Sequence, residues 1–493
     1  MRKLLALIIV SLFLQAWAVS STIYIPADYS TIQAAIHAAQ HGDVLLVAPG
    51  TYPENIDFLG KSIALKSVNG SALTTIEGDR TTHVVTFDSG EGPWSTLEGF
   101  TLINGDRGIL CENSSPTIRL NLITQNDCNE GGAGILCSNS DAVIIQNEIA
   151  DNTAWFGGGG IECRLNSKPQ IKNNVIRDNF CRLDGGGISL DSSLAEVVNN
   201  IISGNTAQQG AGGGIDIYAD VRPLIINNTI FGNRCLISGG GGISIDWAGA
   251  EIINTILWNN SAPIGPEIRV LNTPCLLYIR YSAVQGGMAS LSVAPGCYFI
   301  WGPGMIEENP EFVDPVRDNL KLSRFSPCIN RGSTSEGPDE DIDYDIRPYM
   351  GTTDMGADEF VGTHTLGADN FLLNMSLGGS IGFSLNAGAP HAGRQYLLLG
   401  NYTGTTPGSP LPGGMKTLPL NWDFVIDFVL TLLNTPFFQN FYGTLDAGTG
   451  MAAATLDTFG PVPGSAGIGL SFAFCLNNPF DFVSNPIEVE MRP

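Results

Sequence analysis

Isoleucine, glycine and asparagine recur at a nearly constant interval through the middle of the chain. A Gly-Ile step ends at Ile109, Ile135, Ile161, Ile188, Ile215 and Ile243, and asparagines follow at Asn126, Asn152, Asn179, Asn205, Asn233 and Asn260. Both series repeat every 26 to 28 residues. Because side chains alternate along a strand, each Ile and the residue two places later should point inward. Coils of this length that stack about 4.8 Å apart form a solenoid, so the pattern predicts a parallel β-helix.

The inward positions account for most of the ten cysteines. The position two after each Ile reads Cys111, Cys137, Cys163, Leu190, Ile217 and Ile245, and the position two after each Asn reads Cys128, Ala154, Cys181, Ala207, Cys235 and Ala262. Cysteine shares both positions with small or aliphatic residues, which favours a buried small hydrophobe. A single disulfide from Cys137 to Cys111 or Cys163 on an adjacent coil remains an alternative. Cys275, Cys297 and Cys328 are better candidates for disulfides that connect loops.

The glycines and asparagines of the repeat have structural interpretations of their own. The Gly-Gly-Gly runs suit sharp turns and close approach of the backbone between coils. Asparagines that stack at the same turn of successive coils can form hydrogen bonds along the column, as amide ladders do.

A short amphipathic helix is predicted before the first coil. Ser30 and Gln33 form a capping box, Ile32 and Ile36 lie on one apolar stripe, and Gly42 ends the helix. Such a helix would cover the open edge of the first coil, which otherwise invites pairing with other chains.

The composition divides the chain into three parts. Residues 1–18 have a basic start, an apolar run and a small-x-small end, which predicts a secretory signal peptide. Residues 19–360 form the predicted β-helix, with regular repeats at about 108–262 and a capping region at about 263–360. Residues 361–493 have short apolar runs between Pro and Gly turns, which predicts a small β-sandwich, although Phe424 to Leu433 could instead be a helix. The predicted class is therefore all-β: a right-handed parallel β-helix with an N-terminal capping helix, followed by a small β-sandwich domain.

Charge and hydropathy limit the partners. A net charge of −24 excludes a nucleic-acid partner and disfavours polyanionic glycans unless Ca²⁺ bridges them. No run after residue 18 is long and apolar enough to span a bilayer, so we expect a secreted or cell-surface protein.

Three stretches resemble known families. Thr31-Ile32-Gln33-Ala34-Ala35-Ile36, Ala48-Pro49-Gly50-Thr51-Tyr52 and Gly99-Phe100-Thr101-Leu102-Ile103-Asn104 resemble the opening of pectin methylesterases and other pectin-lyase-like β-helix proteins. In the esterases, catalytic Gln and Asp residues follow the third phrase. Here Gly105-Asp106-Arg107-Gly108-Ile109-Leu110 stands in that place, so the resemblance implies the scaffold and not esterase chemistry.

Two further resemblances imply export and a cell-surface role. The recurring Asn-x-Ala/Cys and Gly-Gly-Gly-Ile phrases resemble the repeats of polymorphic outer membrane proteins of bacteria, which are surface β-helices linked to adhesion. Asn309-Pro310-Glu311-Phe312-Val313-Asp314-Pro315, Ser326-Pro327-Cys328-Ile329-Asn330 and Asp354-Met355-Gly356-Ala357-Asp358 resemble the choice-of-anchor region that ends many exported bacterial β-helix proteins. We expect this region to cap the last coil.

Candidate chemistry lies at outward positions beside the Gly-Ile step. The catalytic candidates are Glu162, Arg164, Asp191, Asp216 and Asp246, expected on one sheet face in successive coils. Carboxylates about 5–10 Å apart suit glycoside hydrolysis, and a carboxylate row could hold Ca²⁺. The favoured alternative is a solvated face whose charge opposes aggregation.

Two further sets of candidates concern glycans and metals. The candidates for stacking on sugar rings are Trp155, Tyr218 and Trp247. Asp341, Asp343 and Asp345 alternate in sequence and are the candidate Ca²⁺ ligands, against the default of a solvated acidic loop. No other cofactor is implied.

Two functions remain open from the sequence. The favoured one is an exported, non-catalytic β-helix protein for surface attachment or glycan binding, with polysaccharide or cell-surface components as partners. The alternative is a polysaccharide lyase or glycoside hydrolase that acts on the outer face of the β-helix.

Overall fold

The computed structural model describes residues 20–492 apart from 324–325, 350–351, 362–365, 369–371, 375–377, 405–407, 413–415, 461–468 and 485. The predicted signal peptide, residues 1–18, lies outside the described residues. The chain divides into two compact units, Met1–Phe360 and Val361–Pro493. Among the described residues, none of the helices has the length and hydropathy needed to cross a bilayer.

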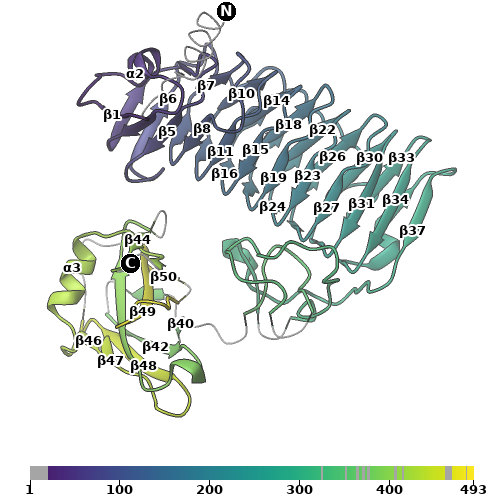
Figure 1. Ribbon diagram of the computed structural model, residues 1–493. Coiled ribbons are helices and arrows are strands. Elements are labelled where there is room, and N and C mark those ends of the chain that lie inside the picture. The colour runs from purple at the N-terminus through teal and green to yellow at the C-terminus, as the bar shows by residue number, and fades with distance from the viewer. Residues whose placement is uncertain are drawn as a thin grey trace, which may run out of the picture. The chain divides into compact units, whose positions relative to one another are not determined.

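The first unit is a parallel β-helix built from three long sheets (Figure 1). Sheet A has twelve strands, from β1 (Thr22–Ile25) to β37 (Tyr298–Trp301). Sheet B has ten, from β3 (Gly50–Pro53) to β35 (Ala283–Val284), and sheet C has ten, from β4 (Ile56–Asp57) to β36 (Leu291–Val293). The predicted fold class is confirmed.

One coil illustrates how the repeat folds. Its strands are β18 (Ile161–Arg164) in sheet C, β19 (Gln170–Lys172) in sheet A and β20 (Val175–Arg177) in sheet B. β21 (Phe180–Cys181) then belongs to a short fourth sheet, sheet D, before a glycine run leads into the next coil. The register is the one that the repeat predicts, with Ile161 beside Ile135 and Ile188. These isoleucines are fully buried in one continuous core.

The predicted asparagine ladder is confirmed, and there are two of them. One ladder contains Asn121, Asn147, Asn174, Asn200 and Asn228, and the other contains Asn126, Asn152, Asn179, Asn205, Asn233 and Asn260. In both, each side-chain amide donates to the amide oxygen of the next coil. The second ladder ends at Glu267, whose carboxylate accepts a 2.6 Å hydrogen bond from the Asn260 amide. Glu267 stands where earlier coils have the glycine before the Ile.

The cysteine interpretation is also supported. Cys111, Cys137 and Cys163 lie in the main core, whereas Cys128 and Cys181 lie in a small separate cluster under the loops that follow sheet B. Cys275 and Cys297 form a disulfide between consecutive coils. Cys328, the third loop candidate, is free and buried.

The predicted capping helix exists, but its predicted N-cap is wrong by one residue. α2 (Ile32–Ala38) begins after Thr31, whose hydroxyl accepts a hydrogen bond from the Ala34 amide. The Glu54 carboxylate accepts from the amides of Ile32 and Gln33 and so takes the role expected of a capping box. Gln33 instead bonds the backbone of Asp57 on the first coil, which fastens the helix there.

The described part of residues 309–360 lies along the outward sides of sheets A and B, and only Ile306 before it continues the stack over the last strand of sheet B. It includes β38 (Phe312–Asp314) and β39 (Asn319–Leu322). Outward-pointing asparagines at the corner between the two sheets fasten this segment: Asn199 donates to the Glu340 carbonyl, Asn227 to Asp354 and Gly356, and Asn254 to Ser333. The segment covers the outward side chain of Ile256 in sheet B, which packs with Leu322, Cys328 and Met355.

The described residues of the second unit form two main sheets around an aromatic core, with a further pair of short strands, β44 (Ser409–Pro410) and β45 (Thr417–Leu418), which confirms the predicted small β-domain. One main sheet contains β40 (Leu366–Ala368), β42 (Ser380–Asn386), β48 (Met451–Asp457) and β46 (Phe438–Gln439); the other contains β41 (Leu372–Asn374), β50 (Ile487–Arg492), β49 (Gly469–Leu476), β43 (Gln395–Asn401) and β47 (Tyr442–Thr444). Both contribute to one core.

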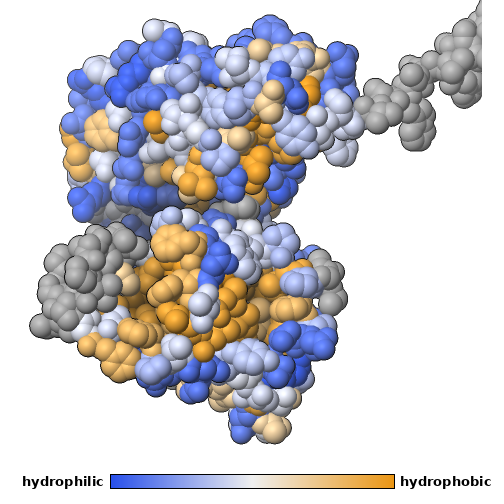
Figure 2. Space-filling model, turned by 90° about the vertical axis from the view of Figure 1, so that its left-hand side faces the viewer, coloured by the Kyte–Doolittle hydropathy of each residue, from blue (hydrophilic) through white to orange (hydrophobic). Residues whose placement is uncertain are grey.

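The ambiguous run of the second unit is a helix, α3 (Phe424–Thr431). Its N-cap, Asp423, accepts hydrogen bonds from the amides of Val425 and Ile426. Phe424 and Phe428 point outward and are exposed, as is Trp422 just before the helix. Apolar side chains gather on the face of this unit that Figure 2 shows, which is the side where α3 lies in Figure 1.

Candidate functional site

The outward side chains of sheet C form two columns. Glu162, Ser189, Asp216 and Ser244 follow one another in the first column, and Arg164, Asp191, Tyr218 and Asp246 in the second. The four candidate carboxylates are therefore divided between two columns. Within each column they are two coils apart, about 9.5 Å along the backbone.

Glycine loops cover the first column. A Cβ added to Gly131 would overlap the Glu162 carboxylate, and one added to Gly212 would overlap Asp216. Asp216 is only 7% exposed. The expectation that this column is a solvated outer face is wrong, because the backbone of each loop lies directly on it and only glycine permits that approach.

Burial changes the protonation of these acids. Desolvation raises the pKa of Glu162 to about 7, against the opposing charges of Arg164 and Arg107. Burial and the neighbouring Asp184 carboxylate raise the pKa of Asp216 well above its usual range. Asp184 comes from the loop itself and accepts a 2.6 Å hydrogen bond from the Ala211 amide. A glycan outside the loops does not reach these carboxylates without displacing the covering backbone.

The second column is more accessible. Tyr218 is 46% exposed, and Arg164, Asp191 and Asp246 are partly buried. The Asp246 carboxylate accepts a 2.7 Å hydrogen bond from the Asn272 amide of the next coil. Trp247 follows in a left-handed turn and is 46% exposed.

Trp155 lies apart from these residues, on a loop next to sheet D. The guanidinium carbon of Arg182 lies 3.8 Å from the centroid of the Trp155 ring. One face of this candidate stacking residue is therefore already occupied by a cation–π contact.

A groove of about 790 Å³ follows the corner where sheet C turns into sheet A. Its lining comes from five successive coils: Leu194, Asp220, Val221, Arg222, Ala248, Gly249, Thr273, Pro274, Cys275, Leu276, Gly296 and Tyr298. Five coils span about 19 Å along the axis. The groove is therefore elongated in the direction in which the coils stack.

The groove combines an exposed aromatic ring with a few polar groups. Tyr298 is 75% exposed, and the disulfide of Cys275 fixes the adjoining wall. Arg222 approaches Glu251 to 3.3 Å, so its charge is partly compensated. The Trp247 carbonyl accepts a 2.7 Å hydrogen bond from the Asp220 amide, so the backbone of this candidate stacking residue adjoins a lining residue of the groove.

Two groove residues were missed from the sequence. Tyr298 lies beyond the regular repeats, and Arg222 lies in a turn between the repeated phrases. The sequence feature that could have identified Tyr298 is the aromatic run from Tyr298 to Trp301, which pairs in register with Leu276 to Ile279.

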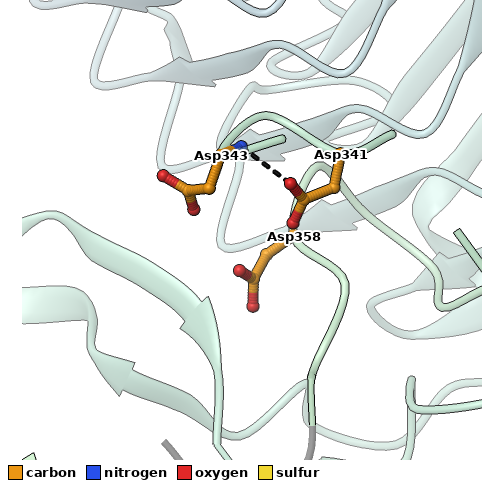
Figure 3. Close-up of side chains that lie close together, drawn as sticks. All are labelled: Asp341, Asp343 and Asp358. Atoms are coloured by element: carbon orange, nitrogen blue, oxygen red, sulfur yellow. Dashed lines mark hydrogen bonds between the residues drawn. The ribbon is translucent and has the colours of Figure 1, made fainter. Parts of the chain in front are cut away.

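The acidic segment near the end of the first unit forms a different cluster from the predicted one. Carboxylate oxygens of Asp341, Asp343 and Asp358 lie within 4.8 Å of one another (Figure 3), whereas Asp345 is not part of the group. Asp341 accepts hydrogen bonds from the amides of Asp343 and Asp345, also seen for Asp343 in Figure 3. Burial and the two other carboxylates raise the pKa of Asp341 to about 8. The ammonium of Lys321 lies 2.8 Å from Asp343 and supplies a positive charge.

The described residues offer oxygen donors of the kind that Ca²⁺ prefers. Three carboxylates close together disfavour full ionisation unless a cation compensates them. Lys321 already provides one compensating charge, so a calcium ion would compete with it.

Comparisons with known proteins agree with the fold. The family model described as "Right handed beta helix region" matches residues 82–261. A cell surface glycoprotein of Methanothermus fervidus is 31% identical over 100 residues, which cover 20% of this chain and 16% of that protein. The match thus spans about a sixth of the relative's length.

Solved structures with a similar fold include two lyases. The pectate lyase Pel9A has 15% identity and a TM-score of 0.44, with 69% of this chain and 96% of that chain covered. An alginate lyase from Paenibacillus has 13% identity and a TM-score of 0.32, with 57% and 98% covered. These likenesses carry no conclusion about the activity of this chain.

Proposed function

We propose that this chain is an exported, non-catalytic β-helix protein of the cell surface that binds glycan chains in the corner groove. The observation that carries the proposal is the contrast between an open groove with an exposed tyrosine and a candidate acid face that lies under glycine loops. The family match supports the scaffold, and the name of the Methanothermus relative supports a surface location.

The charge of the molecule favours an uncharged glycan. With a net charge of −24, the protein repels polyanionic chains. Within the groove, the charges of Arg222 and Asp220 are opposite and offset each other. These residues therefore offer hydrogen bonds to a ligand without a net electrostatic attraction for a charged one. Tyr298 provides a flat apolar surface with a polar tip, which suits the apolar face of a sugar ring.

The test is a binding measurement by calorimetry with a panel of neutral oligosaccharides. Tyr298→Ala should weaken binding about tenfold, because a lost aromatic contact costs about 1.4 kcal/mol. Tyr24→Ala is the matched control, since Tyr24 is 52% exposed on β1 at the other end of the solenoid. Equal affinity of the two variants for every ligand bound would contradict the proposal.

Attachment through the second unit is the other part of the proposal. Large exposed apolar patches commonly mark interaction sites, and Trp422, Phe424 and Phe428 are each more than half exposed. The double substitution Phe424→Ser and Phe428→Ser should reduce binding to cell-wall preparations of the source organism and leave groove affinity unchanged. If the double variant binds the cell-wall preparations as well as the wild type does, attachment through the second unit is contradicted.

A lyase or hydrolase at the outer face of sheet C is the second candidate function. It is favoured by one observation, the pKa of about 7 at Glu162, which suits a general acid or base. A depolymerisation screen with pectic, alginate and neutral glycans, with and without Ca²⁺, tests it. We expect no activity; activity that Asp216→Ala abolishes in a folded protein would establish the enzyme instead.

A further inference from the structure

Three thiols form an uninterrupted row in the core of the β-helix. Cys111, Cys137 and Cys163 occupy the same inward position of consecutive coils in sheet C. All three are fully buried. The same column continues with Phe87 on one side and Leu190 on the other. The row is thus a run of three free thiols within a hydrocarbon column, and the proposed function makes no use of it.

The geometry of the row suits a covalent bond between neighbours. In-register residues of stacked coils lie about 4.8 Å apart, within the Cα separations that disulfides span. The chain already contains such a bond between consecutive coils, because Cys275 and Cys297 directly precede the paired residues Leu276 and Tyr298. Their Cα atoms are 5.0 Å apart.

The middle thiol is the neighbour of both others. Cys137 pairs in register with Cys111 on one side and with Cys163 on the other. The outer two are separated by two coils, about 9.5 Å, which is too far for a disulfide. Any bond in the row must therefore include Cys137.

We propose that this row is a site of oxidative modification, in which Cys137 forms a single disulfide with either Cys111 or Cys163. Two thiols lose two protons and two electrons and form one S–S bond. A small-molecule disulfide takes up the electrons, its own S–S bond breaks, and two thiols are released. The third cysteine of the row stays reduced.

The leftover thiol allows the bond to move. After losing its proton, the free outer sulfur attacks the sulfur of Cys137, and the other outer sulfur leaves as a thiolate that takes up the proton. This exchange involves no net oxidation. Either bond would close a loop of 26 residues, one full coil, and fasten two coils of the solenoid covalently.

The inference rests on the proposed export, because disulfides persist in oxidising compartments. Its test is independent of glycan binding. The full-length protein is produced by refolding from the reduced state with a glutathione couple. It is then denatured, alkylated and analysed by mass spectrometry and peptide mapping.

The expected number of alkylated cysteines in the wild type is six, because two disulfides consume four of the ten. Eight alkylated cysteines would overturn the proposal, since only the bond from Cys275 to Cys297 would then be present. Mapped peptides should join Cys137 to Cys111, to Cys163, or to each in separate molecules.

Two variants separate a row that can exchange from a fixed pair. Cys137→Ala should leave seven of nine cysteines alkylated, because the row loses its common partner. Cys111→Ala should leave five of nine, because Cys137 then bonds Cys163. Cys163→Ala should likewise leave five of nine, and seven alkylated cysteines in either Cys111→Ala or Cys163→Ala would overturn the exchange, because a fixed pair forms only one of the two bonds. If Cys137→Ala does not fold, Cys137→Val replaces it. The peptide map of the wild type also shows whether Cys137 takes part in the second disulfide.

Discussion

The same coil produces two very different surfaces, the covered face of sheet C and the corner groove beside it. On sheet C, glycine runs lie on the first outward column, where Glu162 is partly buried and Asp216 is buried. At the corner, the turns leave a groove in which Tyr298 is largely exposed. Two of the acidic candidates from the sequence, Glu162 and Asp216, therefore lie under backbone, whereas Asp191 and Asp246 in the second column are more accessible.

The difference has a simple physical origin. A chain of glycines can rest directly on a neighbouring strand, because no Cβ keeps the backbones apart. The turns from sheet C to sheet A carry side chains such as Leu194 and Arg222, which prevent that approach and form the walls of a groove. The charged residues in the first outward column of the repeat therefore lie under glycine loops, whereas residues that do not follow the repeat line the groove.

The largest expected effect concerns the covering loops. Gly186→Val should destabilise the first unit by about 3 kcal/mol or more, or prevent folding, because a Cβ there would overlap the Gly213 carbonyl oxygen and the backbone of Thr206. Denaturant unfolding measures the change. Gly92→Ala is the control, since a Cβ at Gly92 meets nothing within 4 Å. Equal stability of the two variants would show that the loops are not in contact with the coils.

A smaller effect is expected from the acid that ends the second asparagine ladder. Burial raises the pKa of Glu267 to about 8, so the folded state holds a proton that the unfolded chain releases above about 4.5. The stability from this proton is complete below about pH 4.5 and is lost as the pH rises through about 8. Its size is on the order of a few kcal/mol.

Glu267→Gln should flatten this part of the pH profile, because the amide oxygen keeps one of the two hydrogen bonds from Asn260 and the side chain does not ionise. Free energies of unfolding at pH 5 and pH 8 provide the measurement. Glu112→Gln, at an exposed position of sheet C, is the control. If both variants lose stability between these pH values as the wild type does, Glu267 is not the group responsible.

The sequence predicts the interior of the solenoid far better than its surface. Columns of Ile161 and its equivalents, the asparagine ladders and the buried cysteines follow from the period alone, because each position has the same environment in every coil. The burial of Asp216 did not follow, since it depends on how a glycine loop folds back in three dimensions. Tyr298 was missed because it belongs to a coil in which the repeat phrases are absent.

The groove predicts effects on binding without effects on stability. Trp247→Ala should lower glycan affinity by about two- to fivefold, less than Tyr298→Ala, because Trp247 adjoins the lining residue Asp220 through its backbone and is not itself in the lining. Unfolding free energy should stay within about 0.5 kcal/mol of wild type, as for other exposed positions. Calorimetry and denaturant unfolding of the same preparations check both statements. A stability loss as large as that of a core substitution would mean that the corner is packed rather than open.

The smallest expected effect is that of calcium on the cluster of Asp341, Asp343 and Asp358. Millimolar Ca²⁺ should raise the Tm of the first unit by only about 1 °C, because the ion must displace the Lys321 ammonium from Asp343. Lys321→Met removes the competing charge and should enlarge the calcium-dependent shift to several degrees, whereas Asp358→Asn should abolish it. Thermal unfolding with Ca²⁺ and with Mg²⁺ at equal ionic strength separates binding from screening. If Lys321→Met shows no calcium-dependent shift, the three carboxylates only accept local hydrogen bonds and form the ion pair. This cluster, like the covered face of sheet C, would then be an acidic group of residues that binds no ligand.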